Sequence, residues 1–145
     1  LIRLQPDKLQ CDIPSKVIAE TPMNEFWTLW RPADLILASR KIVRDELQEK
    51  LFTLHKEKFS DPPVTLCYSP ADIRQHNVDV EIPGGGVQNL VLNDIVLVAV
   101  DAVQNALNMD KSPWTLGYAI TIHSSQGLTI TDTRIWIVDD HIEWS

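Results

Sequence analysis

The residues best suited to chemistry lie close together in the last third of the sequence. Tyr118 to Ile122 alternates between large apolar and smaller residues with the period of two that is typical of a pleated strand. Hydrogen-bonding side chains and one glycine follow at once, and the members of this cluster are Thr121, His123, Ser124, Ser125, Gln126 and Gly127. Glycine lets another molecule approach the main chain closely. Because ligands of open α/β sheets gather at the carboxyl ends of strands, the pattern predicts a binding site here.

Two simpler interpretations of this cluster stay open. A threonine, a histidine and a glutamine at a strand end can satisfy one another and a tight turn. His123 beside Ser124 or Ser125 could also indicate a hydrolase. No Gly-x-Ser-x-Gly elbow and no obvious acidic residue to orient the histidine accompany them, so the hydrolase hypothesis is the weaker one.

A strand and a helix upstream are expected to support the cluster. Leu35 to Ala38 has the pattern of a short buried strand, and Ser39 stands where a helix N-cap belongs. Apolar residues then recur at helical spacing and predict one buried stripe, formed by Val43, Leu47, Leu51 and Leu54. Glu46 and Lys50 have the favourable order for an ion pair on the exposed face.

The middle of the chain is rich in β-branched residues and turn signals. Its short runs predict a small antiparallel β module with strands at Val64 to Tyr68, Val78 to Ile82, Asn89 to Leu92 and Ile95 to Val100. Gly84 to Gly86 could be taken for a phosphate-cradling loop. No Lys-Ser/Thr pair and no helix follow it, so we expect a hairpin turn instead.

Two further strands are predicted toward the end of the sequence. Trp114 to Ile122 leads into the polar cluster, and Thr133 to Val138 forms another strand with Ile135 and Ile137 inward. The acidic residues and histidine that follow it could suggest a magnesium site, and they are Asp139, Asp140 and His141. We expect a solvated strand end here and no metal site.

The first third of the chain is punctuated by prolines. We expect residues 1–33 to be a connector that docks on the core, with a short helix around Asn24 to Trp30. Phe26, Trp27 and Trp30 could stack on nucleic-acid bases. Large aromatic residues at helical spacing are more often packing residues, so burial is expected.

Composition limits the class of protein. The chain has 145 residues, 44% of them hydrophobic, which suits one domain with a buried core. No apolar stretch approaches the roughly 20 residues of a membrane span, and Leu1 to Gln10 lacks a signal-peptide core. Cys11 and Cys67 lie far apart and lack metal-ligand spacing, so thiols are expected, and a disulfide is the less favoured alternative. We therefore expect a soluble intracellular protein without a membrane partner.

The segment from Thr121 to Thr129 resembles motif V of superfamily 1 DNA helicases, in the branch of RecD, Dda and the PIF enzymes. The pattern there reads roughly T-x-H-K-x-Q-G-x-T. The positions kept in this chain are Thr121, His123, Ser125 as a small residue, Gln126, Gly127 and Thr129. The usual lysine after the histidine is Ser124, so one cationic contact of the family is absent at that position.

The resemblance implies roles for these residues. Thr121, His123 and Ser125 would contact single-stranded DNA, with hydroxyl and imidazole donors reaching phosphate oxygens. Gln126 and Gly127 would face the nucleotide and couple its hydrolysis to the strand. The predicted strand at Leu35 and the helix after it resemble the start of the second RecA-like domain, with Gln48 where the family often has asparagine.

The same resemblance implies the fold and the domain order. The fold class would be α/β, a partial RecA-like motor domain of the P-loop NTPase type, formed by residues 34–60 and 114–145. An SH3-like antiparallel β insertion would occupy residues 61–113. The chain begins at Leu1 and lacks Walker A, Walker B and the motif VI arginine. We therefore expect a fragment without catalytic residues, inactive alone.

The intact protein would couple ATP hydrolysis to 5′ to 3′ translocation on single-stranded DNA. ATP and Mg²⁺ would be its cofactors, and an N-terminal motor domain of the same chain would be its partner; the fragment alone would bind neither cofactor. The net charge of −7 is the main objection, because phosphate binding normally leaves a basic footprint. The alternative is a degenerate helicase relic, or a β-rich module that binds a protein through an acidic surface and exposed tryptophans.

Overall fold

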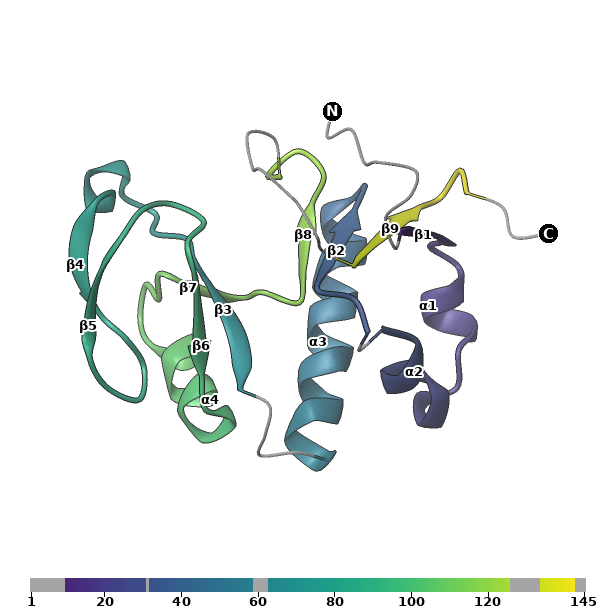
Figure 1. Ribbon diagram of the computed structural model, residues 1–145, viewed down its shortest axis with the longest axis horizontal. Helices are drawn as coiled ribbons and strands as arrows, with labels where there is room; N and C mark the ends of the chain where they lie inside the picture. Colours follow the sequence, from purple (N-terminus) through teal and green to yellow (C-terminus); the bar gives the residue numbers. More distant parts are fainter. Residues whose placement is uncertain (1–9, 31, 59–62, 126–133, 143–145) are drawn as a thin grey trace. The chain divides into compact units, whose positions relative to one another are not determined.

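The computed structural model describes residues 10–30, 32–58, 63–125 and 134–142. Both ends of the sequence contribute to one unit, Leu1–Leu51 with Tyr118–Ser145, and the middle forms a second, Phe52–Gly117. We call them the sheet unit and the β-rich unit. Figure 1 shows the elements of each, coloured along the sequence.

A parallel sheet of four strands forms the core of the sheet unit. Its strands, in spatial order, are β1 (Gln10–Pro14), β9 (Ile135–Asp139), β2 (Leu35–Ala38) and β8 (Ala119–Thr121). Every neighbouring pair is parallel, and Leu37 stands between Ile120 of β8 and Ile137 of β9. The expected α/β class is confirmed as a mixed fold, which combines this parallel sheet and its helices with two small antiparallel sheets.

The strand β1 was not anticipated from the sequence. It lies in the proline-punctuated segment that was expected to be a connector, and it pairs with β9 from Gln10 opposite Ile135 to Pro14 opposite Asp139. Ile13 is fully buried. The first third of the chain therefore contributes an edge strand to the sheet.

The helix α3 (Lys41–Lys58) follows β2 directly, as predicted. The whole predicted stripe is buried, with exposed fractions of 5% or less at Val43, Leu47, Leu51 and Leu54. Lys50 Nζ lies 3.4 Å from Glu46 Oε1, so the predicted ion pair is also present. The predicted N-cap is wrong: the Arg44 N–H donates to Arg40 O, which puts Arg40 at the cap, while the Ser39 N–H donates to Val138 O across the sheet.

Two shorter helices, α1 (Val17–Glu20) and α2 (Met23–Trp30), lie between β1 and β2 in the sequence. Phe26, Trp27 and Trp30 of α2 are buried, which confirms the expected packing role and excludes a base-stacking surface there. The Phe26 and Trp30 rings are tilted against each other with centroids 5.8 Å apart. Lys50 Nζ donates to Ile18 O and lies 5.5 Å from the Phe26 ring centroid, which ties α3 to both short helices.

An antiparallel three-stranded sheet forms the centre of the β-rich unit. Its central strand β3 (Val64–Tyr68) lies between β6 (Ile95–Val98) and β7 (Trp114–Leu116). A separate hairpin joins β4 (Val78–Glu81) to β5 (Val87–Leu90) through the Gly84 to Gly86 turn. All three glycines have positive φ, so the expected hairpin is confirmed and the phosphate-loop alternative is excluded.

Three predicted strands of this region differ in their bounds. The strand predicted at Val78 to Ile82 ends at Glu81, and the one predicted at Asn89 to Leu92 lies two residues earlier, as β5. The run from Ile95 to Val100 ends as a strand at Val98, and α4 (Val100–Asn108) begins two residues later. Val103 and Ala106 of α4 are buried, one helical turn apart. A short 3-10 helix, η1 (Ile73–Gln75), precedes β4. The sequence pattern of alternating valines concealed the start of α4.

The predicted strand from Trp114 to Ile122 is in fact two strands in two different sheets. β7 pairs with β3 in the β-rich unit, and β8 pairs with β2 in the sheet unit. Gly117 separates them: its N–H donates to Thr65 O, and a Cβ at this position would lie 2.7 Å from Thr65 Cγ2. Only glycine allows so close an approach between the segment at Gly117 and strand β3.

The four tryptophans that the structure describes are buried or half-buried. Trp114 is 4% exposed, and the Trp136 Nε1–H donates to Leu29 O at 2.9 Å. Trp30 Nε1 is buried and has no partner among the described residues. The idea that exposed tryptophans form a protein-binding surface is therefore wrong for these positions.

The described helices and cysteines agree with the sequence. None of the described helices is long and apolar enough to cross a membrane. Cys11 and Cys67 are thiols, as expected, and burial raises the pKa of the Cys11 thiol.

The α3 stripe gives a stability test. Leu47→Ala should lower the free energy of unfolding by about 2–5 kcal/mol, because it opens a cavity at a fully buried position. Ile42→Ala, on the same helix and 68% exposed, is the control and should change it by less than about 0.5 kcal/mol. Urea unfolding followed by circular dichroism measures both, and equal effects would show that the stripe does not carry the core.

Candidate functional site

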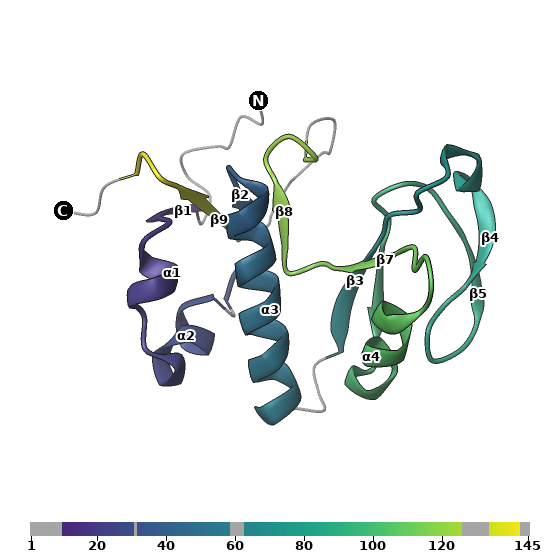
Figure 2. The same cartoon turned by 180° about the vertical axis from the view of Figure 1, so that it is seen from behind.

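The carboxyl ends of the four parallel strands meet at one edge of the sheet, which we call the carboxyl edge. Polar residues follow each strand there: Ser15 after β1, Ser39 and Arg40 after β2, Ser124 after β8, and Asp140 after β9. Figure 2 shows the same sheet from behind, with β8 leading into the turn at this edge. The described part of the predicted polar cluster, Thr121 to Ser125, therefore lies where ligands of open α/β sheets gather.

Thr121 organises the turn that follows β8. Its hydroxyl donates to Ser124 Oγ at 2.8 Å and accepts from the Ser124 N–H at 3.2 Å. The Ser125 N–H donates to Thr121 O, and the Ile122 N–H donates to Ala38 O of β2. The residues from Thr121 to Ser125 thus form a closed turn that is fixed to the neighbouring strand.

The three predicted DNA contacts differ in their exposure. His123 is exposed and Thr121 is half-buried, so both side chains can be reached from solvent. Ser125 is fully buried, and its hydroxyl donates to Ile122 O at 2.6 Å. Its hydroxyl therefore stabilises the turn. Gln126 and Gly127, the predicted nucleotide-coupling residues, lie outside the described residues, as does Thr129.

A second cluster at the carboxyl edge joins three strand ends and was not predicted. Arg40 Nε lies 2.8 Å from Asp140 Oδ2, and the Ser15 hydroxyl donates to Asp140 Oδ1. The bond from Ser15 holds the pKa of Asp140 below its usual range, with Arg40 adding to the effect. The only sequence signal for this cluster is that each residue lies within two positions of the end of a strand.

Gln48 holds β8 from the side opposite β2. It is 8% exposed on α3, and its Oε1 accepts a hydrogen bond from the Ala119 N–H at 3.3 Å. β8 is an edge strand, so this main-chain N–H has no partner strand to bond with. Gln48 therefore positions the strand that leads into the polar cluster.

The described acidic residues at the carboxyl edge are engaged in contacts of their own. No group of three His, Cys, Asp or Glu side chains among the described residues could hold a metal ion. Asp140 is engaged by Arg40 and Ser15, and Asp139 Oδ1 accepts from the His141 N–H, in agreement with a solvated strand end. The glycine turn at Gly84 closes a hairpin, so this turn is not a P-loop.

The Gln48 bond can be tested by removing its acceptor. Gln48→Met keeps the length of the side chain but leaves the buried Ala119 N–H unpaired, which should destabilise the fold by about 1–3 kcal/mol. The Ala119 amide should also exchange with solvent faster, as measured by NMR. Glu49→Met places the same side chain at the next, exposed position and should leave this amide protected. Equal protection in both variants would contradict the role of Gln48.

The Asp140 cluster predicts a shift in titration. Because the folded pKa is lowered, the cluster stabilises the fold above the usual carboxyl pKa of about 3.9, and this contribution is lost as pH falls through the lowered value. Ser15→Ala should raise the pKa of Asp140 toward about 3.9, measured from its carboxyl ¹³C shift. Ser39→Ala, at the same edge, should leave it unchanged. A pKa unaffected by Ser15→Ala would contradict the assignment.

Comparison with known proteins provides no further assignment. No protein-family model, no curated protein and no solved structure matches this chain. The geometry of the carboxyl edge and the motif resemblance are therefore the evidence on which a function can be argued.

Proposed function

We propose that this chain is part of the second RecA-like motor domain of a superfamily 1 DNA helicase, with the Thr121 to Ser125 turn as part of its single-stranded DNA contact. The observation that carries this proposal is the order of the segments. β2, α3, the β-rich unit and β8 follow one another in the sequence, and β8 then returns beside β2 in one parallel sheet. The turn that follows β8 carries Thr121, His123 and Ser125, three of the residues that resemble motif V.

The fold supports the proposal at a coarse level. A parallel sheet with a helix directly after its central strand suits a RecA-like domain, and the β-rich unit would be its SH3-like insertion. The sheet places the turn at an edge where a ligand could reach His123 and Thr121. An insertion of this kind leaves the strand order of the sheet intact.

The net charge of −7 can be reconciled with binding to DNA. Hydroxyl, imidazole and main-chain donors bind phosphate oxygens without a formal charge of their own, and a narrow track needs few of them. Arg40 adds a cation at the carboxyl edge, although Asp140 partly neutralises it. We therefore expect weak salt dependence of DNA binding compared with a protein that uses a lysine-rich surface.

The chemistry of hydrolysis would come from outside the described residues. In the intact protein, ATP and Mg²⁺ would be bound with the N-terminal motor domain, because phosphoryl transfer depends on a P-loop lysine, a metal ion and arginines. Gln126 and Gly127 would couple that event to the DNA strand. The residues of this chain would then hold the strand and change their contacts with each hydrolysis cycle.

The full-length protein allows a direct test. His123→Ala should weaken binding of a fluorescein-labelled oligothymidylate by up to about tenfold, because one exposed hydrogen-bond donor to phosphate is lost. Gln126→Ala should keep that affinity and lose the stimulation of ATP hydrolysis by DNA. Fluorescence anisotropy and a coupled ATPase assay measure the two effects.

The control is His76→Ala, which removes another exposed imidazole from the β-rich unit and should leave DNA affinity and hydrolysis unchanged. A full-length protein that neither hydrolyses ATP nor moves along single-stranded DNA would contradict the motor and favour a degenerate relic.

A further inference from the structure

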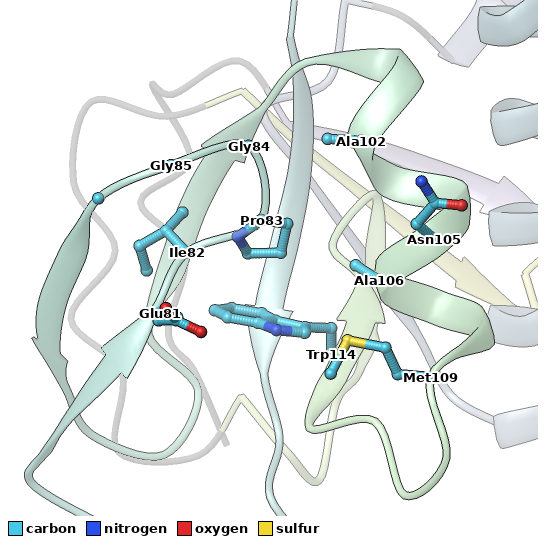
Figure 3. A pocket seen from close by; sticks show the side chains of 11 residues that line it. Glu81, Ile82, Pro83, Gly84, Gly85, Ala102, Asn105, Ala106, Met109 and Trp114 are labelled. Carbon is cyan, nitrogen blue, oxygen red and sulfur yellow. The ribbon is translucent and has the colours of Figure 1, made fainter.

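A cleft of about 440 Å³ opens on the β-rich unit and shares no lining residue with the carboxyl edge. The turn of the β4–β5 hairpin forms one wall and α4 forms the other, with Trp114 of β7 between them (Figure 3). All eleven lining residues belong to this one unit. None of them takes part in the proposed DNA contact.

The cleft is apolar where it is deepest and open to solvent above. Ile82, Ala106 and Trp114 are buried beneath it, while Met109 is 56% exposed at its rim. Pro83 adds a rigid apolar wall. Surfaces of this kind bind partner side chains by burial of their hydrocarbon parts.

Small residues, Gly84 and Ala102, keep the cleft open between the hairpin turn and α4. A Cβ on Gly84 would lie 3.5 Å from the Cβ of Ala102, so any larger side chain at either position would narrow the cleft. Gly84 to Gly86 also have φ between +89° and +130°, where other residues are strained. The width of the cleft is therefore fixed by the absence of side chains on the hairpin turn.

The charge of the cleft selects for a cation. Glu81 is the only ionisable residue among those that line it, and it is exposed. In Figure 3 its carboxylate and the Trp114 ring lie at the same end of the cleft, together with Met109. Between Val78 and Leu116 the sequence has five carboxylates and a single lysine, so this segment is acidic overall. Outside the segment, Lys56 Nζ lies 3.4 Å from Gln104 Oε1 of α4.

We propose that this cleft binds an extended, basic peptide segment of a partner protein. One lysine or arginine of the segment would lay its hydrocarbon stem over Trp114 and Met109 and pair its cation with Glu81. Asn105, exposed on α4, offers an amide for hydrogen bonds to the peptide main chain. The site is independent of the proposed motor function.

The same features disfavour other ligands. A phosphate backbone or an anionic membrane would be repelled by the carboxylate of Glu81. An open cleft between a hairpin and a helix suits a continuous chain that enters at one end and leaves at the other.

The test uses the full chain and an array of fluorescein-labelled octapeptides of glycine and serine with one arginine flanked by proline and valine. A matched array carries citrulline, which is neutral and nearly isosteric, in place of arginine. Arginine peptides should bind at least tenfold more tightly than their citrulline partners. Amide shifts in NMR spectra should appear at Gly84, Ala102 and Asn105.

Three variants separate the contributions. Glu81→Gln removes only the charge and should weaken binding about tenfold. Ala102→Leu fills the cleft on a helix that accepts leucine and should abolish binding. Asp79→Asn removes an equal charge from the same strand outside the cleft and should have little effect.

The proposal fails if arginine and citrulline peptides bind alike, or if Glu81→Gln and Asp79→Asn weaken binding equally. It also fails if no peptide binds at millimolar concentration, or if amide shifts cluster outside the cleft. Shifts at the cleft amides with oligothymidylate or with anionic phosphatidylserine vesicles, in place of peptide, would overturn it as well.

Discussion

Parallel pairing on both edges of β2 is the constraint on which the sheet unit depends. The strand has only the residues Leu35–Ala38, yet it pairs with β8 and β9, whose residues lie 83 and 100 positions later in the chain. Parallel strands cannot be joined by a tight turn, so the segments between them must leave the sheet and return. The helix α3 and the β-rich unit occupy this long connection. The same pairing brings the ends of four strands to one edge.

Local patterns predicted local features well. The buried stripe of α3, the hairpin at Gly84 to Gly86 and the packing of Phe26 followed from helical spacing and turn chemistry, which act over a few residues. β1 could not be foreseen, because its residues do not alternate and its partner β9 is distant in sequence. The break at Gly117 is equally non-local, since it results from contact with Thr65.

The candidate site shows the same division between local and distant information. The cluster from Thr121 to Ser125 was found because its residues are adjacent in the sequence. The bonds from Ser15 and Arg40 to Asp140 join residues that lie 125 and 100 positions apart, and no spacing rule reveals them. Gln48 became meaningful only when the edge position of β8 was known, because an unpaired strand N–H creates the need for an acceptor.

The hydroxyl of Thr121 is already engaged on both sides, as donor to Ser124 Oγ and as acceptor from the Ser124 N–H. A phosphate oxygen that accepts a hydrogen bond from this hydroxyl would replace Ser124 Oγ as the acceptor. One hydrogen bond would then be exchanged for another, and little affinity would be gained. The exchange would release Ser124 from the turn. Under the proposed function, Thr121 would therefore contribute more to sensing bound DNA than to the affinity for it.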